Sequence, residues 1–372
     1  MKIEIREVRC KNELKQFIYL PAKIYKNNSV WVPPIYSDEW KYFNKKKYKH
    51  YKYCDTILFL AFRGKEVVGR IMGIINKEYN LLKNEKTARF EHFVCYDAAE
   101  IAKLLFEKIK DWAKEKNMNE LVGPFGFNDK DPQGLLIEGY EHHPVISTIY
   151  NEKYLVRLLE GEGFTKKTDL VAYNIPVTEK IPEFYNRIFE RVNKNNDFEV
   201  LEFTSRKKLK PYIVPVFRMV NKTFVDIYGF APISDEEAIE FADIYLPVID
   251  HKFVKLVYKD GKEVAFILAM PDISQGIKKA KGKLFPFGIL KILRSGKKTK
   301  KLVLLLGAID PKYRGIGLDS ILGIKTLRSA QKKGMTNIDS HLELEGNTKV
   351  RAEMEKMGGK VYKKYRIYKK EI

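Results

Sequence analysis

The first chemical signal in this sequence is a loop with two glycines between two regular segments. Arg314 is followed by Gly315 and Gly317, and the chain then continues with the helix-like pattern SILGIKTLRSAQKK. A strand that leads through glycines into a helix N-terminus points several backbone N–H groups at one spot, where the helix dipole adds partial positive charge. Because glycine also permits a tight turn and close approach, this pattern favours a bound phosphate, with Arg314 as a charged donor.

Asp319 stands where such a loop would have its last small residue. An inward carboxylate would compete with a phosphate for the same N–H groups. An outward carboxylate would leave those groups free and would favour the helix N-terminus. The alternative to a phosphate site is an ordinary strand-to-helix turn in which Asp319 caps the helix.

Candidates for proton transfer lie on the next expected strand, NIDSHLEL (residues 337–344). Alternation along a strand places His341 and Glu343 on one face, and either residue has the chemistry of a general base. Both residues could equally be solvated or hydrogen-bonded edge residues. Asn347 begins the last expected helix, where it can act as an N-cap.

The elements that would position these residues occur twice along the chain. Each half has a strand pair around a glycine turn, and each closes with a polar start, an amphipathic helix, a glycine stop and an aromatic-rich strand. We therefore predict a tandem repeat of one α/β unit with a mixed sheet. The expected divisions are a first domain at 1–176, a linker helix at 177–195 and a second domain at 196–372.

The first half lacks the glycine loop. At the equivalent place it reads CYDAAEIA (residues 95–102), which can open a helix but has no glycine for close approach of a phosphate. The first domain is therefore expected to shape the substrate cleft or to support the second domain. A further stretch, EGYEHHPV (residues 138–145), is expected to form a turn or a cleft wall rather than a metal site, because adjacent side chains on an extended chain point opposite ways.

The net charge of +21 is unevenly distributed. Residues 276–301 contain ten Lys or Arg and no Asp or Glu, around the apolar stretch LFPFGILKIL. This insert is interpreted as a buried hairpin or helix with basic ends, as an amphipathic element on an anionic membrane, or as a lid over an acyl chain. We favour the first interpretation. Three scattered cysteines and the lack of a long apolar run or signal-peptide core favour a cytoplasmic protein, with peripheral membrane association as an open alternative.

The second half resembles the GCN5-related N-acetyltransferase (GNAT) superfamily in the strand KLVLLLGAID, the loop at 314–319, the following helix and strand, Asn347 and the Gly358–Gly359 break. The whole chain is similar to a less characterised two-domain GNAT family, in VGPFGFNDKDPQGLLIEGYEHHPV, YNEKYLVRLLEGEGF and KKYRIYKK. An acidic residue at the position of Asp319 agrees with that family, which favours its outward orientation. The resemblance implies two tandem GNAT-like domains.

The resemblance also implies that an acyl-CoA, with acetyl-CoA as the first expectation, binds the second domain and that its acyl group moves to an amine. The implied donor-binding residues are Ala308, Ile309, Arg314, Gly315, Ile316, Gly317, Leu318, Asp319, Ser320 and Asn347. Glu343 and His341 are the candidate bases. Met354 stands where the superfamily has a tyrosine acid. Another tyrosine could act, with Tyr365 as the candidate and Tyr362 also near in sequence; otherwise the thiolate leaves without an acid or the domain is not an active transferase. No metal is expected.

Two other functions stay open at this point. One is a tandem GNAT-type transferase that uses aminoacyl-tRNA, which the positive charge would suit, or a long-chain acyl donor at a membrane surface. The other is a non-catalytic protein that keeps the fold and binds CoA or RNA.

Overall fold

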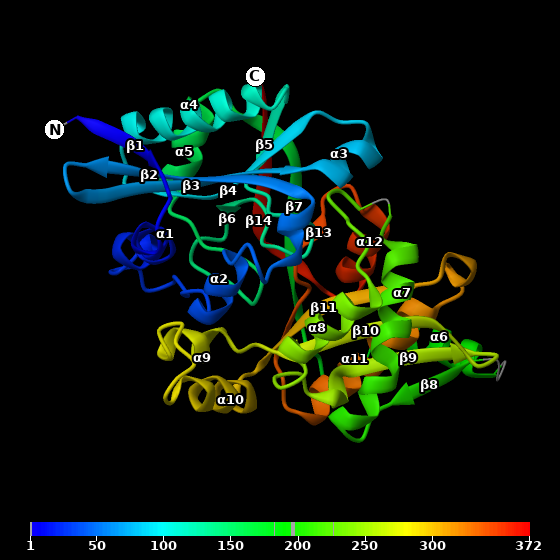
Figure 1. Cartoon of the computed structure of the whole chain (residues 1–372). Helices are drawn as coiled ribbons and strands as arrows, with labels where there is room; N and C mark the ends of the chain where they lie inside the picture. Colours follow the sequence, from blue (N-terminus) through cyan, green and yellow to red (C-terminus); the bar gives the residue numbers. More distant parts are fainter. Residues whose placement is uncertain (1, 182, 195–197, 226) are drawn as a thin grey trace. The chain divides into compact units, whose positions relative to one another are not determined.

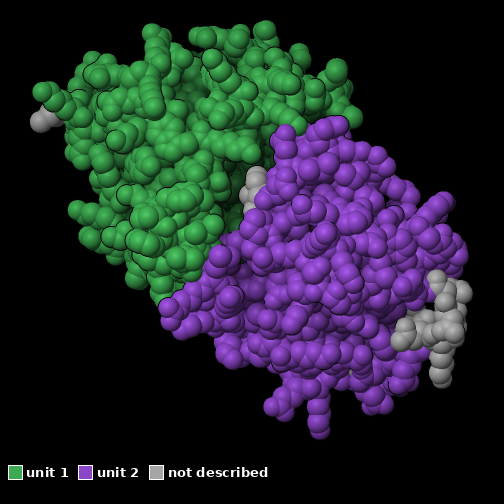
Figure 2. All heavy atoms as spheres, turned by 60° about the horizontal axis from the view of Figure 1, so that its bottom comes forward, with its two compact units in different colours: residues 1–171, 274–292, 362–372 green, residues 172–273, 293–361 purple. Residues whose placement is uncertain are grey.

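The structure is a computed structural model, and it describes the 372-residue chain except residues 1, 182, 195–197 and 226. The chain forms two compact units, coloured separately in Figure 2. Unit 1 comprises residues 1–171, 274–292 and 362–372, and unit 2 comprises residues 172–273 and 293–361. Each unit is a mixed α/β structure, as predicted. The expected domain boundary near residue 195 lies outside the described residues.

Unit 1 is built on a mixed sheet whose strands follow the order β1-β2-β3-β4-β5-β14, with β6 paired to β14 (Figure 1). The strands that begin and end in unit 1 are β1 Ile3–Glu7, β2 Cys54–Arg63, β3 Glu66–Asn76, β4 Thr87–Cys95, β5 Glu120–Gly123 and β6 Leu135–Glu138. The helices are α1 Lys11–Ile24, α2 Tyr36–Tyr42, η1 Lys49–Lys52, α3 Lys77–Lys83, α4 Ala99–Glu115 and α5 Lys153–Gly161.

Alternation along the strands explains why helices cover both faces of this sheet. In β2, Phe59 and Ala61 pack into a core with α4 and α5, whereas Leu58 and Leu60 pack into a second core with α1 and α2. Successive strand residues point to opposite faces, so a strand with apolar residues at every position requires cover on both sides. Figure 1 shows α4 and α5 on one face and α1 and α2 on the other.

Unit 2 has the same plan, with the strand order β7-β12-β11-β10-β9-β8. Its strands are β8 Glu199–Glu202, β9 Val254–Lys259, β10 Lys262–Pro271, β11 Lys301–Ile309, β12 Asn337–Asp339 and β13 Glu343–Leu344. The helices are α6 Glu183–Lys194, η2 Arg206–Tyr212, α7 Ile213–Thr223, α8 Asp235–Tyr245, η3 His251–Phe253, η4 Pro311–Tyr313, α11 Leu318–Lys332 and α12 Thr348–Lys356. The α7 side and the α11 side form separate cores.

The compact units differ from the contiguous domains expected at 1–176 and 196–372, because the last strands of the two sequence halves are exchanged. Residues 174–176 of β7 (Thr165–Pro176) pair antiparallel with β12 in unit 2. Residues 368–371 of β14 (Lys360–Glu371) pair antiparallel with β5 in unit 1. The helix expected as a linker, α6, packs against α11, with the Arg328 guanidinium 4.9 Å from the centre of the Phe189 ring.

Two shared irregularities show that the units are repeats of one fold. The parallel ladder of β4 with β5 covers only residues 87–89, and that of β11 with β12 covers only residues 301–303, so both pairs diverge beyond this point. The adjoining antiparallel ladders, β3 with β4 and β10 with β11, are also interrupted at matching places. The extra residue lies between Glu91 and Val94 in β4 and between Leu304 and Leu306 in β11. Each interruption is a β-bulge, which bends a strand and increases its twist.

The basic insert joins β10 to β11. It contains α9 (Ser274–Lys279) and α10 (Gly288–Lys298). In the part of the chain that the structure describes, no helix is both long and apolar enough to cross a membrane.

Candidate functional site

The glycine loop follows β11 and leads directly into α11. Gly315 has φ 79° and Gly317 has φ 101°, so both residues adopt the left-handed backbone that favours glycine. A Cβ atom added at Gly315 would meet nothing within 4 Å. The loop is therefore open on this side and gives a ligand access to the main chain.

The loop ends at a helix start whose N–H groups are available. Gly317 is the N-cap residue of α11, and no side chain caps the helix. Within the described residues, no protein acceptor is recorded for the N–H groups of residues 315–318. The first N–H groups of any helix lack intrahelical acceptors, and an anion can satisfy them.

Asp319 does not fill this loop. It is exposed in the first turn of α11, two residues beyond the N-cap, so it is not the helix cap. The pKa of Lys356 on α12 is raised mainly by its hydrogen bond to Glu353, with a smaller contribution from Asp319. The carboxylate of Asp319 therefore attracts the Lys356 ammonium on α12.

Arg314 is exposed, and its Nε donates to the carbonyl oxygen of Ile309 at 3.2 Å.

The other residues implied as donor contacts divide into two groups. Ala308, Leu318 and Ser320 are buried, so they can offer a ligand little beyond their main chain, whereas Ile316 is 40% exposed. Asn347 is the N-cap of α12, where its side-chain oxygen accepts the N–H of Val350. This contact supports the capping role and leaves the amide nitrogen of Asn347 available for a donor contact.

The segment expected as one strand at 337–344 is broken. It forms β12 and β13 with a bend between them, and His341 has φ 62°. The bend has one local and one distant cause. The Asp339 carboxylate accepts the N–H of His341 at 2.7 Å, and Ser340 exchanges hydrogen bonds with the main chain of Tyr173. Simple alternation therefore does not apply across the bend, and the expectation that His341 and Glu343 share a face for that reason was wrong.

Glu343 has the electrostatics of a general base. Its side chain is half-buried, and burial raises the pKa of its carboxyl group to about 8. Among the described residues, no cation offsets this effect. A base whose pKa lies near the operating pH is well suited to accept a proton during a reaction. His341 is also half-buried, but the bend places it in a different local conformation from Glu343.

Tyr365 is poorly placed to be the acid. It lies in the part of β14 that belongs to unit 1, opposite Leu136 of β6, and its side chain is 0% exposed. A phenol without exposed surface offers a leaving thiolate no approach. We therefore give Tyr365 no role in the proposal below.

Sequence reasoning missed a polar cluster on α12 of unit 2. The hydroxyl of Tyr173 donates to Glu355 at 2.8 Å and accepts from Nε of Arg351 at 2.9 Å, while a second guanidinium nitrogen of Arg351 donates to the carbonyl oxygen of Glu345. The spacing of Arg351 and Glu355, four residues apart on one helix, was the available signal. This cluster fixes α12 against β7 and against the segment that follows Glu343.

The equivalent place in unit 1 is a connection of three residues, 96–98, that has no glycine and is contacted by side chains of α5. The hydroxyl of Tyr154 donates to the carbonyl oxygen of Cys95 at 2.8 Å, and Arg157 pairs with Asp97. The helix that follows has Ala98 as its N-cap residue, in an extended conformation. Unit 1 therefore has the strand and the helix of the repeat without an open loop between them.

At its bulge, unit 1 carries charged residues where unit 2 has leucines. His92 has φ 55° and lies between two carboxylates, with Nε2 3.6 Å from Glu39 and Nδ1 3.3 Å from Glu91. Burial alone would lower the pKa of His92, but these carboxylates raise it to about 9. Tyr42 also donates to Glu91. The result is an internal ion network in which His92 is held as a cation.

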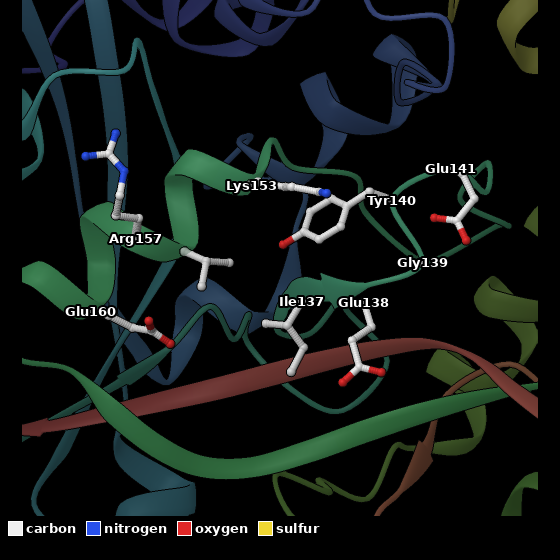
Figure 3. Close-up of a pocket in the computed structure, with 9 residues that line it drawn as sticks. Ile137, Glu138, Gly139, Tyr140, Glu141, Lys153, Arg157 and Glu160 are labelled. Atoms are coloured by element: carbon white, nitrogen blue, oxygen red, sulfur yellow. The ribbon is translucent and has the colours of Figure 1, made fainter.

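A pocket of about 690 Å³ also lies in unit 1, between the turn after β6 and helix α5 (Figure 3). Its charged residues have internal partners: Glu138 pairs with Lys364, Glu160 accepts from Tyr368, and Lys153 lies over the ring of Tyr140. The turn expected at 138–145 forms part of the pocket wall.

The two histidines of this turn have separate contacts, His143 with the carbonyl oxygen of Val30 and His142 with the ring of Tyr362. Among the described residues, no group of three His, Cys, Asp or Glu could hold a metal ion.

These features define the class of protein. Each unit has diverging parallel strands, a bulge in the strand before the helix, and the matching order of elements, so the chain consists of two consecutive GNAT folds. No family model matches the sequence. A solved structure of a tandem GNAT protein from the clavulanic acid biosynthesis pathway, without acetyl-CoA, covers 100% of this chain and 98% of its own, with a TM-score of 0.56 at 10% identity.

Two curated relatives match along nearly the whole chain. A protein named bacterial ceramide synthase, from Caulobacter vibrioides, is 26% identical over 100% of this chain and 98% of its own length. Protein YghO of Escherichia coli is 25% identical over 99% of this chain and 95% of its own length.

Proposed function

We propose that this protein is an acyl-CoA-dependent N-acyltransferase whose donor site lies in unit 2. The observation that carries the proposal is the open loop at 314–317, whose free N–H groups lead into an uncapped helix beyond the end of β11, a strand that diverges from β12 after Val303. The loop and Arg314 would hold the phosphates of CoA, because backbone donors, a helix dipole and a guanidinium all favour an anion. Bound acyl-CoA supplies a thioester. The residues of the chain hold it and accept the proton that the amine loses.

Glu343 is the residue that we propose as the general base. An amine must lose a proton when it becomes an amide, and a carboxylate with a pKa near 8 can take that proton near neutral pH. The raised pKa also leaves a large fraction of Glu343 protonated at pH 7, so the reaction would be favoured by a moderately alkaline medium. His341 is the second candidate for this step.

The acceptor that we propose is a long-chain amine. A ceramide is the amide of a long-chain amino alcohol, so the name of the Caulobacter relative supports transfer of an acyl group to an amine of this kind. At this level of identity the acyl length can differ between the two proteins. A long-chain donor is therefore the working choice, with acetyl-CoA as the alternative.

Calorimetry with Gly317→Glu tests the donor site. The substitution places a carboxylate at a residue with φ 101° beside the free N–H groups, so the affinity for CoA should be lost. Gly261→Glu is a matched control, because Gly261 also has positive φ and open space but lies in the turn between β9 and β10. Near-normal affinity in Gly317→Glu would remove the basis of the proposal.

A panel of substrates tests the reaction itself. The full chain is incubated with acetyl-CoA or palmitoyl-CoA and with a sphingoid base or a short amine, and release of free thiol is measured. The proposal predicts thiol release that depends on both partners. Binding of CoA without turnover would identify a non-catalytic protein, and binding of aminoacyl-tRNA in place of CoA would identify a transferase that uses another carrier.

A further inference from the structure

The basic insert presents large apolar side chains to solvent. We call residues 281–298 the docking segment. Its exposed side chains are Phe285 (81%), Phe287 (66%), Ile289 (42%) and Leu290 (61%). The sequence favoured a buried hairpin or helix with basic ends. A helix forms and Ile292 is buried, but these four residues lie outside the core. Single exposed apolar residues are normal on a protein surface, but four large ones within six residues of the chain indicate an interaction site.

The exposure follows from the local fold. The chain turns back so tightly before α10 that a Cβ at Gly288 would lie 1.7 Å from the carbonyl oxygen of Lys283. The inward face of α10 is formed at a spacing of four residues by Gly288, Ile292 and Gly296, and Ile292 is only 3% exposed. Residues that lie between these positions, Ile289 and Leu290 among them, must therefore project outward.

The docking segment is firmly anchored at its start. The N–H of Tyr36 donates to the carbonyl oxygen of Gly282 at 2.9 Å. Gly282 has φ 70°, and a Cβ there would lie 2.2 Å from the carbonyl oxygen of Pro34, so only glycine permits this contact. Ile277 and Ala280 are buried just before it. Figure 1 shows this part of the chain at α9 and α10. The segment that carries the exposed apolar residues is therefore held in place by hydrogen bonding and burial at its start.

The positive charge of the docking segment indicates which kind of partner it binds. Between residues 276 and 301 there are ten Lys or Arg and no Asp or Glu. Lys281, Lys283, Lys291 and Arg294 are exposed beside the four apolar residues. A second copy of this segment would be repelled by its like charge, and a nucleic acid would leave the aliphatic side chains in water. An anionic lipid surface satisfies both features, since its headgroups attract cations and its acyl chains accept apolar groups.

We propose that the docking segment binds anionic membranes, with Phe285, Phe287 and Leu290 inserted among the lipids and the lysines at the headgroups. This peripheral attachment involves no crossing of the bilayer. It stands on exposed side chains and charge alone, so it is independent of the acyl-transfer proposal. It would, however, hold the enzyme where a long-chain amine is dissolved.

Flotation with vesicles tests the proposal on the full chain. Binding to phosphatidylcholine vesicles should be weak, and added phosphatidylglycerol should strengthen it in a manner that salt reverses, since exposed charges are screened over about 8 Å at physiological ionic strength. The variant Phe285→Ala/Phe287→Ala/Leu290→Ala should bind anionic vesicles at least about tenfold more weakly. Unchanged thermal stability and CoA affinity would show that this variant is folded.

Leu81→Ala/Leu82→Ala is the matched control, because both leucines are strongly exposed on α3 but lie where acidic and basic residues alternate, in the stretch KEYNLLKNEK (residues 77–86), and not in a segment free of acidic residues. It should bind vesicles like the wild type. Insertion is read directly from Phe287→Trp, whose fluorescence should be quenched by brominated acyl chains. Equal binding to neutral and anionic vesicles, no loss in the triple variant, or a concentration-dependent dimer that buries the introduced Trp without lipid would each overturn the proposal.

Discussion

Glu343 illustrates at the residue scale how burial without a counter-ion prepares a carboxylate for proton transfer. Its pKa of about 8 means that the active, ionised form increases as the pH rises through that value. For the wild type, kcat/KM should therefore rise between pH 6 and 9. Glu343→Gln should lower it by about 10²–10⁴-fold, the usual contribution of a general base, and should abolish the rise. Glu353→Gln, at a half-buried residue of α12 that pairs with Lys356, should keep both the rate and the profile.

The same raised pKa affects stability. The unfolded carboxyl loses its proton near 4.5, whereas the folded one keeps it to about 8. Between these values the folded state binds more protons, so stability falls as the pH rises. Glu343→Gln removes this dependence. Its Tm should exceed that of the wild type at pH 9 and should match it more closely at pH 5. Parallel Tm curves for the two proteins would contradict the assigned pKa.

Asp319 is a second residue whose environment defines a test. Because it is exposed and acts on α12, Asp319→Gly should change CoA affinity by less than about tenfold, or about 1.4 kcal/mol. Loss of the carboxylate near a helix start should cost about 0.3–1 kcal/mol of stability. Calorimetry and thermal melting measure the two effects, and Asp319→Asn separates charge from backbone freedom. Strong CoA binding that appears only in Asp319→Gly would show that the native carboxylate blocks the loop.

At the scale of elements, the exchanged last strands make each unit depend on the other half of the chain. Tyr365, Ile367 and Tyr368 of β14 are each 0% exposed within unit 1. At about 1.5–3 kcal/mol for each fully buried side chain, their loss is comparable to the total stability of a domain, about 5–15 kcal/mol.

Deletion of residues 361–372 should therefore unfold unit 1, although these residues lie at the far end of the sequence. Hydrogen exchange should show lost protection in β4 and β5. A deletion of only Glu371 and Ile372 is the comparison. It removes the pairing with Glu120 and the hydrogen bond to Asn119, so protection should fall only at that end of β5. A fragment limited to residues 1–195 should likewise fail to fold alone. A soluble, cooperative fragment would contradict this account of the exchange.

The elements also show which features the sequence could reveal. The repeat was predictable, because strands, helices and glycine stops recur in one order, and so was the glycine loop with its helix. The exchange of β7 and β14 was not, since pairing partners across a long separation leave no local signal. The bend at His341 was missed for a related reason. It depends on the Asp339 side chain and on Tyr173, a residue from the other half of the sequence.

The whole molecule is a repeat in which one unit keeps the open loop and the other has lost it. Unit 2 has Gly315 and Gly317 at the helix start, while unit 1 has Tyr154 and the Arg157–Asp97 pair at the matching place. The bulges of the two units also differ. The bulge of unit 1 contains His92 between two carboxylates, whereas that of unit 2 contains leucines. A repeat of this kind often suggests two equivalent sites, but the closed loop of unit 1 argues for one.

We expect the whole chain to bind one CoA. A ligand that binds only the folded state at a free concentration of 100 Kd stabilises it by about 2.7 kcal/mol, and this stabilisation should be local to unit 2. Calorimetry should give a stoichiometry of one per chain. Hydrogen exchange should show protection at residues 304–322 and none at residues 95–102. As a control, Tyr154→Phe removes the hydroxyl contact to Cys95 and should leave the stoichiometry unchanged, because unit 1 still lacks the glycines that let a phosphate approach the main chain. Two CoA molecules per chain, or protection at the start of α4, would show that the closed loop of unit 1 also binds the donor.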